Sequence, residues 1–422
     1  MISIVQAPYK YTPAENRIIF QVQSDNPNFT YFKVEILEAT SLQTISRQEI
    51  TPFPNYVNGS YIDISDIISN AVKWEVTNTQ FNLYVPIKRP ILKYKVKIIE
   101  TGIVAGLITD LSTLILPDTY TTWEAEMGGL EFHGFNPAVY VIGNTGLPAK
   151  FLTYKPNSVT VNQFSTEQLY FMQDYVSTLK IVVKAYHDVV LEQTYTEYIS
   201  GLNLYNMFMI QVSPKVLGDY FLIDFGFIDN YTVHLEDVDG NIKSEVRKYK
   251  YEVLDCQYIP VNIGWLNSIG GFDWYQFVNP IESNEVSRNS FKKQTMQFVN
   301  GFFVDKVKDV FNSPEEIINV KQSGNYTVHT RFLTDRETKW LNELVISKQV
   351  FQELGDNSLL PIVLETKNYK VDRQQYDRTK PIVKTFDYHY DGQIIPAEMM
   401  VYANSFNGNL SMDFISDQFE EN

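Results

Sequence analysis

The chain has 422 residues, of which 50 are acidic and 35 basic, so its formal net charge is −15 at pH 7. Nucleic-acid binding needs a positive surface, and the basic residues here form no block, which disfavours sequence-specific binding to DNA or RNA. No run of about 18 apolar residues occurs, which disfavours a membrane span. The lone cysteine, Cys256, rules out an intrachain disulfide framework.

Length and residue types favour a multidomain β-protein. A chain of this length is expected to form about three domains. Its 28 tyrosines and 27 phenylalanines, with many Val, Ile, Thr and Asn residues, suit pleated, half-buried surfaces. The N-terminal residues lack a basic start followed by an apolar core, so no signal peptide is indicated. We therefore predict a mainly β fold with a few short helices.

The first predicted domain spans residues 1–110. Apolar and polar residues alternate over 18–23, 31–37 and 92–100, which is typical of half-buried strands. Residues 61–68 predict a strand that turns into a short helix at Ser65. Short strands at this spacing, separated by turn residues, predict an immunoglobulin-like or fibronectin-like β-sandwich.

The second predicted domain, residues 111–250, is also β-rich. Its first part, residues 114–148, contains Trp123 and several glycines and has the character of long loops, which makes it a candidate contact surface. Asp239 and Gly240 predict a hairpin turn. The strands predicted after these loops share an alternating or β-branched pattern and cover residues 168–172, 178–186, 192–198 and 206–212.

The densest aromatic stretch, residues 261–277, opens the third predicted domain, residues 251–422. A β-hairpin is predicted by an apolar or β-branched run through Trp265 up to Leu266, a turn with Gly270 and Gly271, and a return through Phe272 and Trp274. Adjacent glycines permit positive φ, and the aromatic side chains offer wide surfaces to bury. We interpret these residues as a structural anchor or an interface.

A short helix is predicted near residues 334–347. Thr334 and Glu337 match a capping box, and Trp340 and Leu344 then fall on one helical face, together with Leu341 and Val345. Trp340 and Leu344 join the residues interpreted as structural or interfacial.

Three further segments of the third domain carry predictions. The polar, basic-leaning residues 285–297 predict an extended arm or exposed strand, and residues 314–320 a short helix. Residues 384–390 predict a strand that pairs, through a turn at Asp391 and Gly392, with the residues after that turn. The acidic end, residues 417–421, is expected to be frayed.

No constellation of residues indicates catalysis, and we predict no enzyme, cofactor or metal. Asp237 to Asn241 echo a calcium loop but lack its glutamate at position twelve, so a hairpin turn is the better interpretation. The five histidines lie far apart in sequence. Cys256 sits among apolar and aromatic residues and is expected to be buried. The common nucleotide-binding and hydrolase motifs are missing.

The order of several segments resembles that of virion structural proteins of tailed phages that infect Bacteroidota, including crAss-like phages and relatives. The segments that carry the resemblance are residues 20–26, 52–54, 62–65, 261–277, 334–344 and 360–363. The resemblance implies a non-enzymatic subunit of the tail, neck or baseplate, repeated as a ring around the tail axis. Its implied partners are copies of itself and other tail or neck proteins. The implied location is the virion tail, after synthesis and assembly in the host cytoplasm.

Two other classes of function stay open. Exposed tyrosines and tryptophans also suit a carbohydrate-binding or receptor-binding β-sandwich, with a shallow aromatic cleft expected in the loops of residues 111–150. A surface-polymer hydrolase would need two carboxylates that converge in a groove, and 50 acidic residues offer many candidate pairs.

Overall fold

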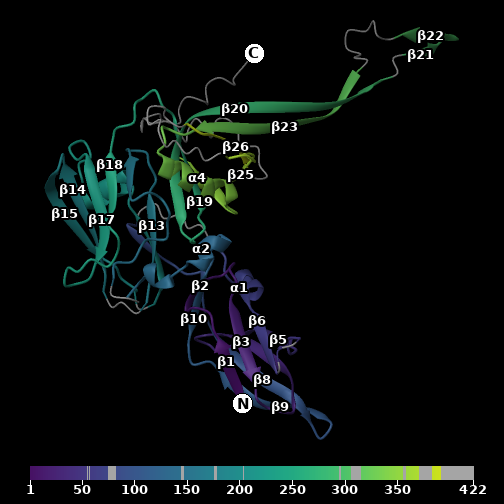
Figure 1. Ribbon diagram of the computed structural model, residues 1–422. Helices are drawn as coiled ribbons and strands as arrows, with labels where there is room; N and C mark the ends of the chain where they lie inside the picture. Colours follow the sequence, from purple (N-terminus) through teal and green to yellow (C-terminus); the bar gives the residue numbers. More distant parts are fainter. Residues whose placement is uncertain are drawn as a thin grey trace.

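The computed structural model describes residues 1–54, 56, 58–74, 82–143, 147–174, 178–202, 204–293, 296–305, 315–354, 358–369 and 383–390. Strands dominate these residues, as predicted, and the few helices are short. Figure 1 shows an N-terminal β-domain at one end, two further β-domains that form a broader body, and a long two-stranded arm that projects from that body.

The N-terminal domain is a β-sandwich. One sheet contains β1 (Ile2–Gln6), β3 (Ile19–Ser24) and β6 (Gly59–Asp63). The other contains β2 (Tyr11–Pro13), β10 (Tyr120–Trp123), β8 (Ile91–Val104), β4 (Phe29–Glu38) and β5 (Thr44–Ile50), with β9 (Leu107–Ile115) also paired to β8. Phe20, Phe32 and Ile98 are buried between the sheets.

The predicted end of this domain at residue 110 needs correction. Residue 110 lies inside β9, which pairs with β8 along its length, and β10 returns to the same sheet. The sandwich therefore continues to Trp123. The strand-to-helix transition predicted at Ser65 is present as α1 (Ser65–Ala71).

The middle domain is a second sandwich. One sheet contains β11 (Val141–Ile142), β13 (Gln168–Gln173), β16 (Met207–Gln211) and β7 (Tyr84–Ile87). The other contains β12 (Ser158–Val161), β18 (Arg247–Tyr251), β17 (Asn230–Glu236), β14 (Lys180–His187) and β15 (Val190–Tyr198). Because β7 precedes β8 in sequence, this domain borrows a strand from the predicted first domain. Its short helices are α2 (Gly129–His133), η1 (Pro137–Val139) and α3 (Pro214–Phe221).

The third domain is a closed barrel, a form that the residue pattern did not predict. Its strands, in order around the barrel, are β19 (Pro260–Leu266), β20 (Phe272–Lys292), β23 (Glu315–His329), β26 (Thr385–Tyr390), β25 (Leu359–Leu364) and β24 (Val350–Glu353). The predicted helix is present as α4 (Asp335–Ile346), and Thr334 and Glu337 form the predicted capping box.

The arm is the continuation of β20 and β23 beyond the barrel, and β21 (Met296–Val299) and β22 (Phe302–Asp305) form a small hairpin at its tip (Figure 1). The prediction of an arm over 285–297 is confirmed for the described residues. The helix predicted over 314–320 is wrong, because β23 begins at Glu315 and pairs with β20.

Two smaller predictions have opposite outcomes. Asp237 to Asn241 form a turn in which Gly240 has a φ of 83°, as the hairpin interpretation predicted. Cys256 is exposed in a turn, so its predicted burial is wrong. The pairing predicted through Asp391 and Gly392, and the frayed end at 417–421, lie outside the described residues.

Candidate functional site: the three-domain junction and the exposed arm

The turn between β19 and β20 inserts into a core shared by all three domains, which we call the junction core. Ile269 and Phe272 from this turn pack with Trp123 of the N-terminal domain and Tyr170 of the middle domain. Trp74 lies between them, with its ring centroid 5.4 Å from that of Phe272 and 5.3 Å from that of Tyr170. The predicted hairpin is therefore an inter-domain seam.

Polar contacts fix the path of this turn. The Asn267 side chain accepts hydrogen bonds from the amides of Ile269 and Gly271 at 3.1 and 3.0 Å, and donates one to the Leu152 carbonyl at 2.9 Å. Trp123 Nε1 donates to the Ile269 carbonyl at 2.6 Å. Each of these buried polar groups is thereby satisfied, as a turn inside a core requires.

Both positions in this turn require glycine. Gly270 has a φ of 89°, a conformation that side chains with a Cβ rarely adopt. Gly271 lies against another domain, since a Cβ built on it would be 2.3 Å from the Leu152 carbonyl oxygen. Gly270 therefore sets the turn, and both glycines allow another domain to approach closely, since a Cβ on Gly270 would be 2.5 Å from the Glu124 carbonyl oxygen.

The remaining predicted residues also lie inside the chain. Trp265, Trp340 and Leu344 belong to the barrel core, where the two indole rings are 5.0 Å apart. Trp340 Nε1 donates to the buried Asp273 carboxylate at 2.6 Å, and Trp274 Nε1 donates to Gln168 of the middle domain at 3.0 Å. The structure thus brings the predicted residues together as an internal seam, and buries them away from any partner subunit.

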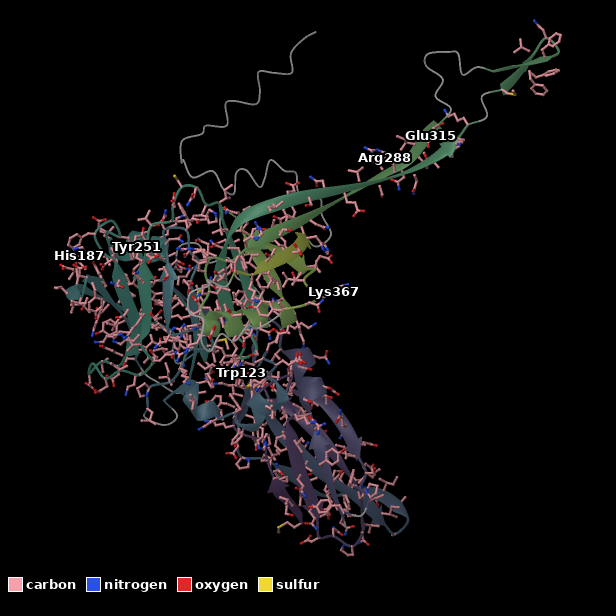
Figure 2. All side chains as sticks on the ribbon, turned by 45° about the horizontal axis from the view of Figure 1, so that its top comes forward. Trp123, His187, Tyr251, Arg288, Glu315 and Lys367 are labelled. Carbon is pink, nitrogen blue, oxygen red and sulfur yellow. The ribbon has the colours of Figure 1, made fainter. Side chains whose placement is uncertain are left out.

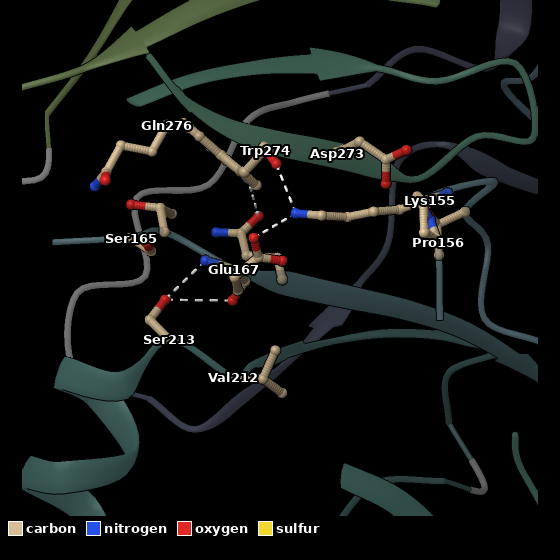
Figure 3. A network of polar contacts seen from close by, with 12 residues as sticks. Lys155, Pro156, Ser165, Glu167, Val212, Ser213, Asp273, Trp274 and Gln276 are labelled. Atoms are coloured by element: carbon tan, nitrogen blue, oxygen red, sulfur yellow. Dashed lines mark hydrogen bonds and ion pairs between the residues drawn. The ribbon is translucent and has the colours of Figure 1, made fainter. Parts of the chain in front are cut away.

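A buried cation joins the barrel to the middle domain (Figure 3). Lys155 Nζ pairs with Glu167 and donates to the Trp274 carbonyl at 2.7 Å. It also lies 5.0 Å from the centroid of the Trp340 ring. Burial raises the pKa of Glu167 despite the nearby Lys155. Removing either charge would leave the other one buried and unpaired, which is costly.

The arm has the opposite character, because it is exposed on both faces. Every described residue from Ile281 to Lys293 on one strand, and from Glu315 to Val320 on the other, is exposed. Figure 2 shows Arg288 and Glu315 far out along the ribbon, away from the body. An isolated two-stranded ribbon is marginally stable in water. We therefore expect the arm to be stabilised by packing against a partner surface.

The pairing of β20 with β23 sorts the arm side chains onto two faces. Directly opposed residues point to the same face of an antiparallel pair, and Arg288 opposes Val320 while Ser290 opposes Ile317. Val286 shares the face of Arg288 because it lies two residues away. This face therefore carries exposed Val286, Val320 and Ile317 around one guanidinium.

The tip of the arm is strongly apolar. Phe298 and Phe303 oppose each other, 66% and 68% exposed, with ring centroids 5.1 Å apart, and Phe302 is 74% exposed. Asn300 and Gly301 form the turn, both with positive φ. Sequence reasoning missed this hairpin, although Asn-Gly between apolar residues is a strong hairpin signal.

Four of the five aromatic residues in 111–150, where a sugar-binding cleft was expected, are buried. Tyr120, Trp123, Phe135 and Tyr140 all lie in the N-terminal core or the junction core. Stacking on a sugar needs an open ring face. These four rings offer none, and the fifth, Phe132, is half-buried against the junction core. Residues 111–150 therefore do not favour the carbohydrate-binding alternative.

None of the helices described in the chain is long and apolar enough to span a membrane. Within the same described ranges, no three His, Cys, Asp or Glu side chains are grouped closely enough to hold a metal ion.

Comparisons with known proteins return structural likeness at a low level. No protein-family model matches the chain, and no curated protein matches its sequence. Among solved structures, it is similar to the plexin A4 extracellular region, with 8% identity, a TM-score of 0.16, and 92% of this chain and 39% of plexin A4 covered. A marsupial T cell receptor matches with 8% identity, a TM-score of 0.18, and coverage of 79% and 96%. The Dpr2 Ig1-Ig2 complex with DIP-Theta Ig1-Ig3 matches with 10% identity, a TM-score of 0.15, and coverage of 60% and 99%.

Proposed function

We propose that this chain is a non-enzymatic structural subunit of a bacteriophage tail, neck or baseplate, in which copies repeat as a ring and each arm packs on the next copy. The single observation that carries the proposal is the arm, an exposed β-ribbon with an apolar tip. The phage setting rests on the sequence resemblance alone.

The arm and its tip expose apolar side chains. Contiguous apolar patches are rare on monomeric proteins and mark interaction sites. Ribbon edges without a neighbouring strand also invite pairing with another chain. A neighbouring copy that covers the arm would bury its apolar side chains and pair with its open strand edge. Because the arm and the surface that receives it differ, the contact is heterologous, and a heterologous contact forms a ring when its rotation closes and a filament when it does not.

A second apolar hairpin lies at the far end of the molecule from the arm (Figure 1). The turn between β8 and β9 exposes Ile103, Val104, Leu107 and Ile108. Two apolar tips at opposite ends suit a subunit that contacts its own ring through one end and another tail or neck protein through the other.

Shortening the arm tests the proposal. Ser283 and Asn325 oppose each other near the root of the arm, so a two-residue Asn-Gly turn can replace residues 284–324 without disturbing the barrel. We expect the full chain to form a closed oligomer in size-exclusion chromatography with light scattering, and the short-arm variant to be monomeric with an unchanged melting temperature.

A tip variant serves as the matched control. Phe298→Ser with Phe303→Ser keeps the length of the ribbon but removes its exposed rings, and it should weaken assembly without abolishing folding. A full chain that stays monomeric at every concentration and binds no other virion protein would contradict the proposed function. An oligomer that survives loss of the arm would contradict the role given to the arm.

A further inference from the structure

Lys155 and Glu167 form a lysine–carboxylate pair that is enclosed by protein. Their side chains are only 7% and 8% exposed, and the ammonium group of Lys155 contacts a carboxylate oxygen of Glu167. Lys155 Nζ also donates a hydrogen bond to the Trp274 carbonyl oxygen at 2.7 Å and lies over the Trp340 ring. The amine and the carboxyl group are therefore held together inside the interface between the middle domain and the barrel (Figure 3).

The backbone of both residues is fixed by hydrogen bonds. The Lys155 carbonyl oxygen accepts from Arg247 Nη1 at 3.0 Å, and the Lys155 amide donates to Thr153 Oγ1 at 2.9 Å. The Glu167 amide donates to Ser213 Oγ at 2.9 Å. Two groups held in this way react as if each were present at a very high local concentration, because the entropic cost of bringing them together is already met by folding.

The surroundings of the pair favour uncharged groups. Burial raises the pKa of Glu167, and the nearby Asp273 carboxyl raises it further against the opposing effect of Lys155. Buried charges carry a desolvation cost even when they are paired. Condensation of the amine with the carboxyl group replaces both charges with one neutral amide, so the same burial that disfavours the ion pair favours the amide.

We propose that Lys155 and Glu167 form an intramolecular isopeptide bond. A proton passes from the Lys155 ammonium to the Glu167 carboxylate, and the neutral Nζ then attacks Cδ of Glu167. The Nζ–Cδ bond forms, the bond between Cδ and one Oε breaks, and that oxygen leaves with two hydrogens as water. The hydrogen that remains on Nζ donates to the Trp274 carbonyl oxygen, as one does before the reaction.

The bond closes a loop in the middle domain, on the side that the barrel covers. The two linked residues are 12 positions apart, with β12 between them, and β13 begins directly after Glu167. A covalent cross-link limits the freedom of the unfolded chain, as a disulfide does, and so stabilises the folded one. This modification goes beyond the proposed structural role and does not depend on it.

Mass spectrometry of the purified full chain after denaturation and trypsin digestion tests the proposal. Trypsin does not cut between Lys155 and Pro156, so both linked residues fall in the peptide of residues 151–180. We expect this peptide to be about 18 Da lighter than its sequence requires, the mass of one water. Its fragmentation should give no ions from breaks between residues 155 and 167, because the cross-link holds the pieces together.

An exposed pair of the same chemistry is the matched control. Lys250 Nζ lies 2.6 Å from a carboxylate oxygen of Glu252, but the two side chains are 58% and 40% exposed. Their charges stay solvated, so trypsin should cut after Lys250 as it does after any free lysine. In a second variant, Lys155→Arg keeps the positive charge but not the amine, so peptide 151–180 should have its full mass and the chain a lower melting temperature.

The peptide from the original chain decides the proposal even if the Lys155→Arg variant does not fold. Full mass together with a complete series of fragments between residues 155 and 167 would overturn it. A loss of water that persists in Lys155→Arg would also overturn it, because the loss would then come from another site. Assembly plays no part in this readout, so the result is separate from that of the short-arm variant.

Discussion

Gly271 shows how one residue controls the fit of two domains. A Cβ at this position would lie 2.3 Å from the Leu152 carbonyl oxygen, a backbone atom that cannot swing away as the end of a flexible side chain could. We expect Gly271→Val to lower the free energy of unfolding by about 3 kcal/mol or more, because the junction core must open to admit the side chain. Chemical denaturation monitored by tryptophan fluorescence measures this.

Gly129→Val is the matched control, since a Cβ there meets no atom within 4 Å. Substitutions of the five histidines or of the exposed Cys256 should each cost less than the change at Gly271. Equal tolerance of all these substitutions would show that the seam does not hold the domains together.

Glu343 gives the protein a pH dependence. Burial, with the nearby Asp273, raises the pKa of this carboxyl to about 8 from 4.5. A raised carboxyl pKa means that the folded chain holds the proton while the unfolded chain loses it above pH 4.5. Stability from this group is therefore full below pH 4.5 and is lost as pH rises toward 8, by roughly 5 kcal/mol in all.

Glu343→Gln keeps the neutral shape and the acceptor for the Ser268 hydroxyl, which lies 2.9 Å from Oε1. Its free energy of unfolding should depend less on pH than that of the unmodified chain between about pH 5 and pH 8. Urea titrations at several pH values compare the two slopes. Parallel slopes would mean that this carboxyl ionises normally in the folded protein.

At the scale of single elements, α4 is held by its cap. Thr334 Oγ1 accepts from the Glu337 amide at 3.3 Å, and Glu337 accepts from the Thr334 amide at 2.8 Å. Thr334→Ala removes one half of this exchange and should lower the free energy of unfolding by about 1 kcal/mol. Thr334→Ser, which retains the hydroxyl, should cost little, and a similar loss in both variants would argue against the cap.

Sequence patterns predicted elements where the cause of the structure is local. Alternation located β13 to β16, and the Thr334 and Glu337 pair located α4. Residues 314–320 were predicted as a short helix, yet the pairing with β20 makes the described part, from Glu315 onward, a strand. Contacts such as that of Ser290 with Glu315 join residues 25 positions apart, a distance that no local pattern records.

For the candidate site too, the local features could be predicted from the sequence and the long-range contacts could not. Aromatic density and glycines located the seam at 261–277, because buried segments are enriched in apolar and aromatic residues. The assignment of β7 to the middle domain and the closure of the barrel depend on which sheet a strand joins, and alternation is the same in either case. The predicted burial of Cys256 was wrong for a related reason, because apolar neighbours in the sequence do not ensure that a residue is buried.

At the scale of the whole molecule, the three domains and the arm form a simple division of roles. The junction core and the Lys155 network join the domains through buried contacts. The arm and the β8–β9 turn carry apolar side chains outward at opposite ends. In our proposal the first set of contacts makes one body of the chain, and the second set joins bodies into a ring.

The most direct measurement is a cryo-EM map of the assembled chain, alone or in its particle, at a resolution that traces the backbone. Our account predicts copies related by rotation about one axis, with the arm of each copy packed along the next copy and its tip buried there. Copies without rotational symmetry, or arms that contact no neighbour, would contradict it.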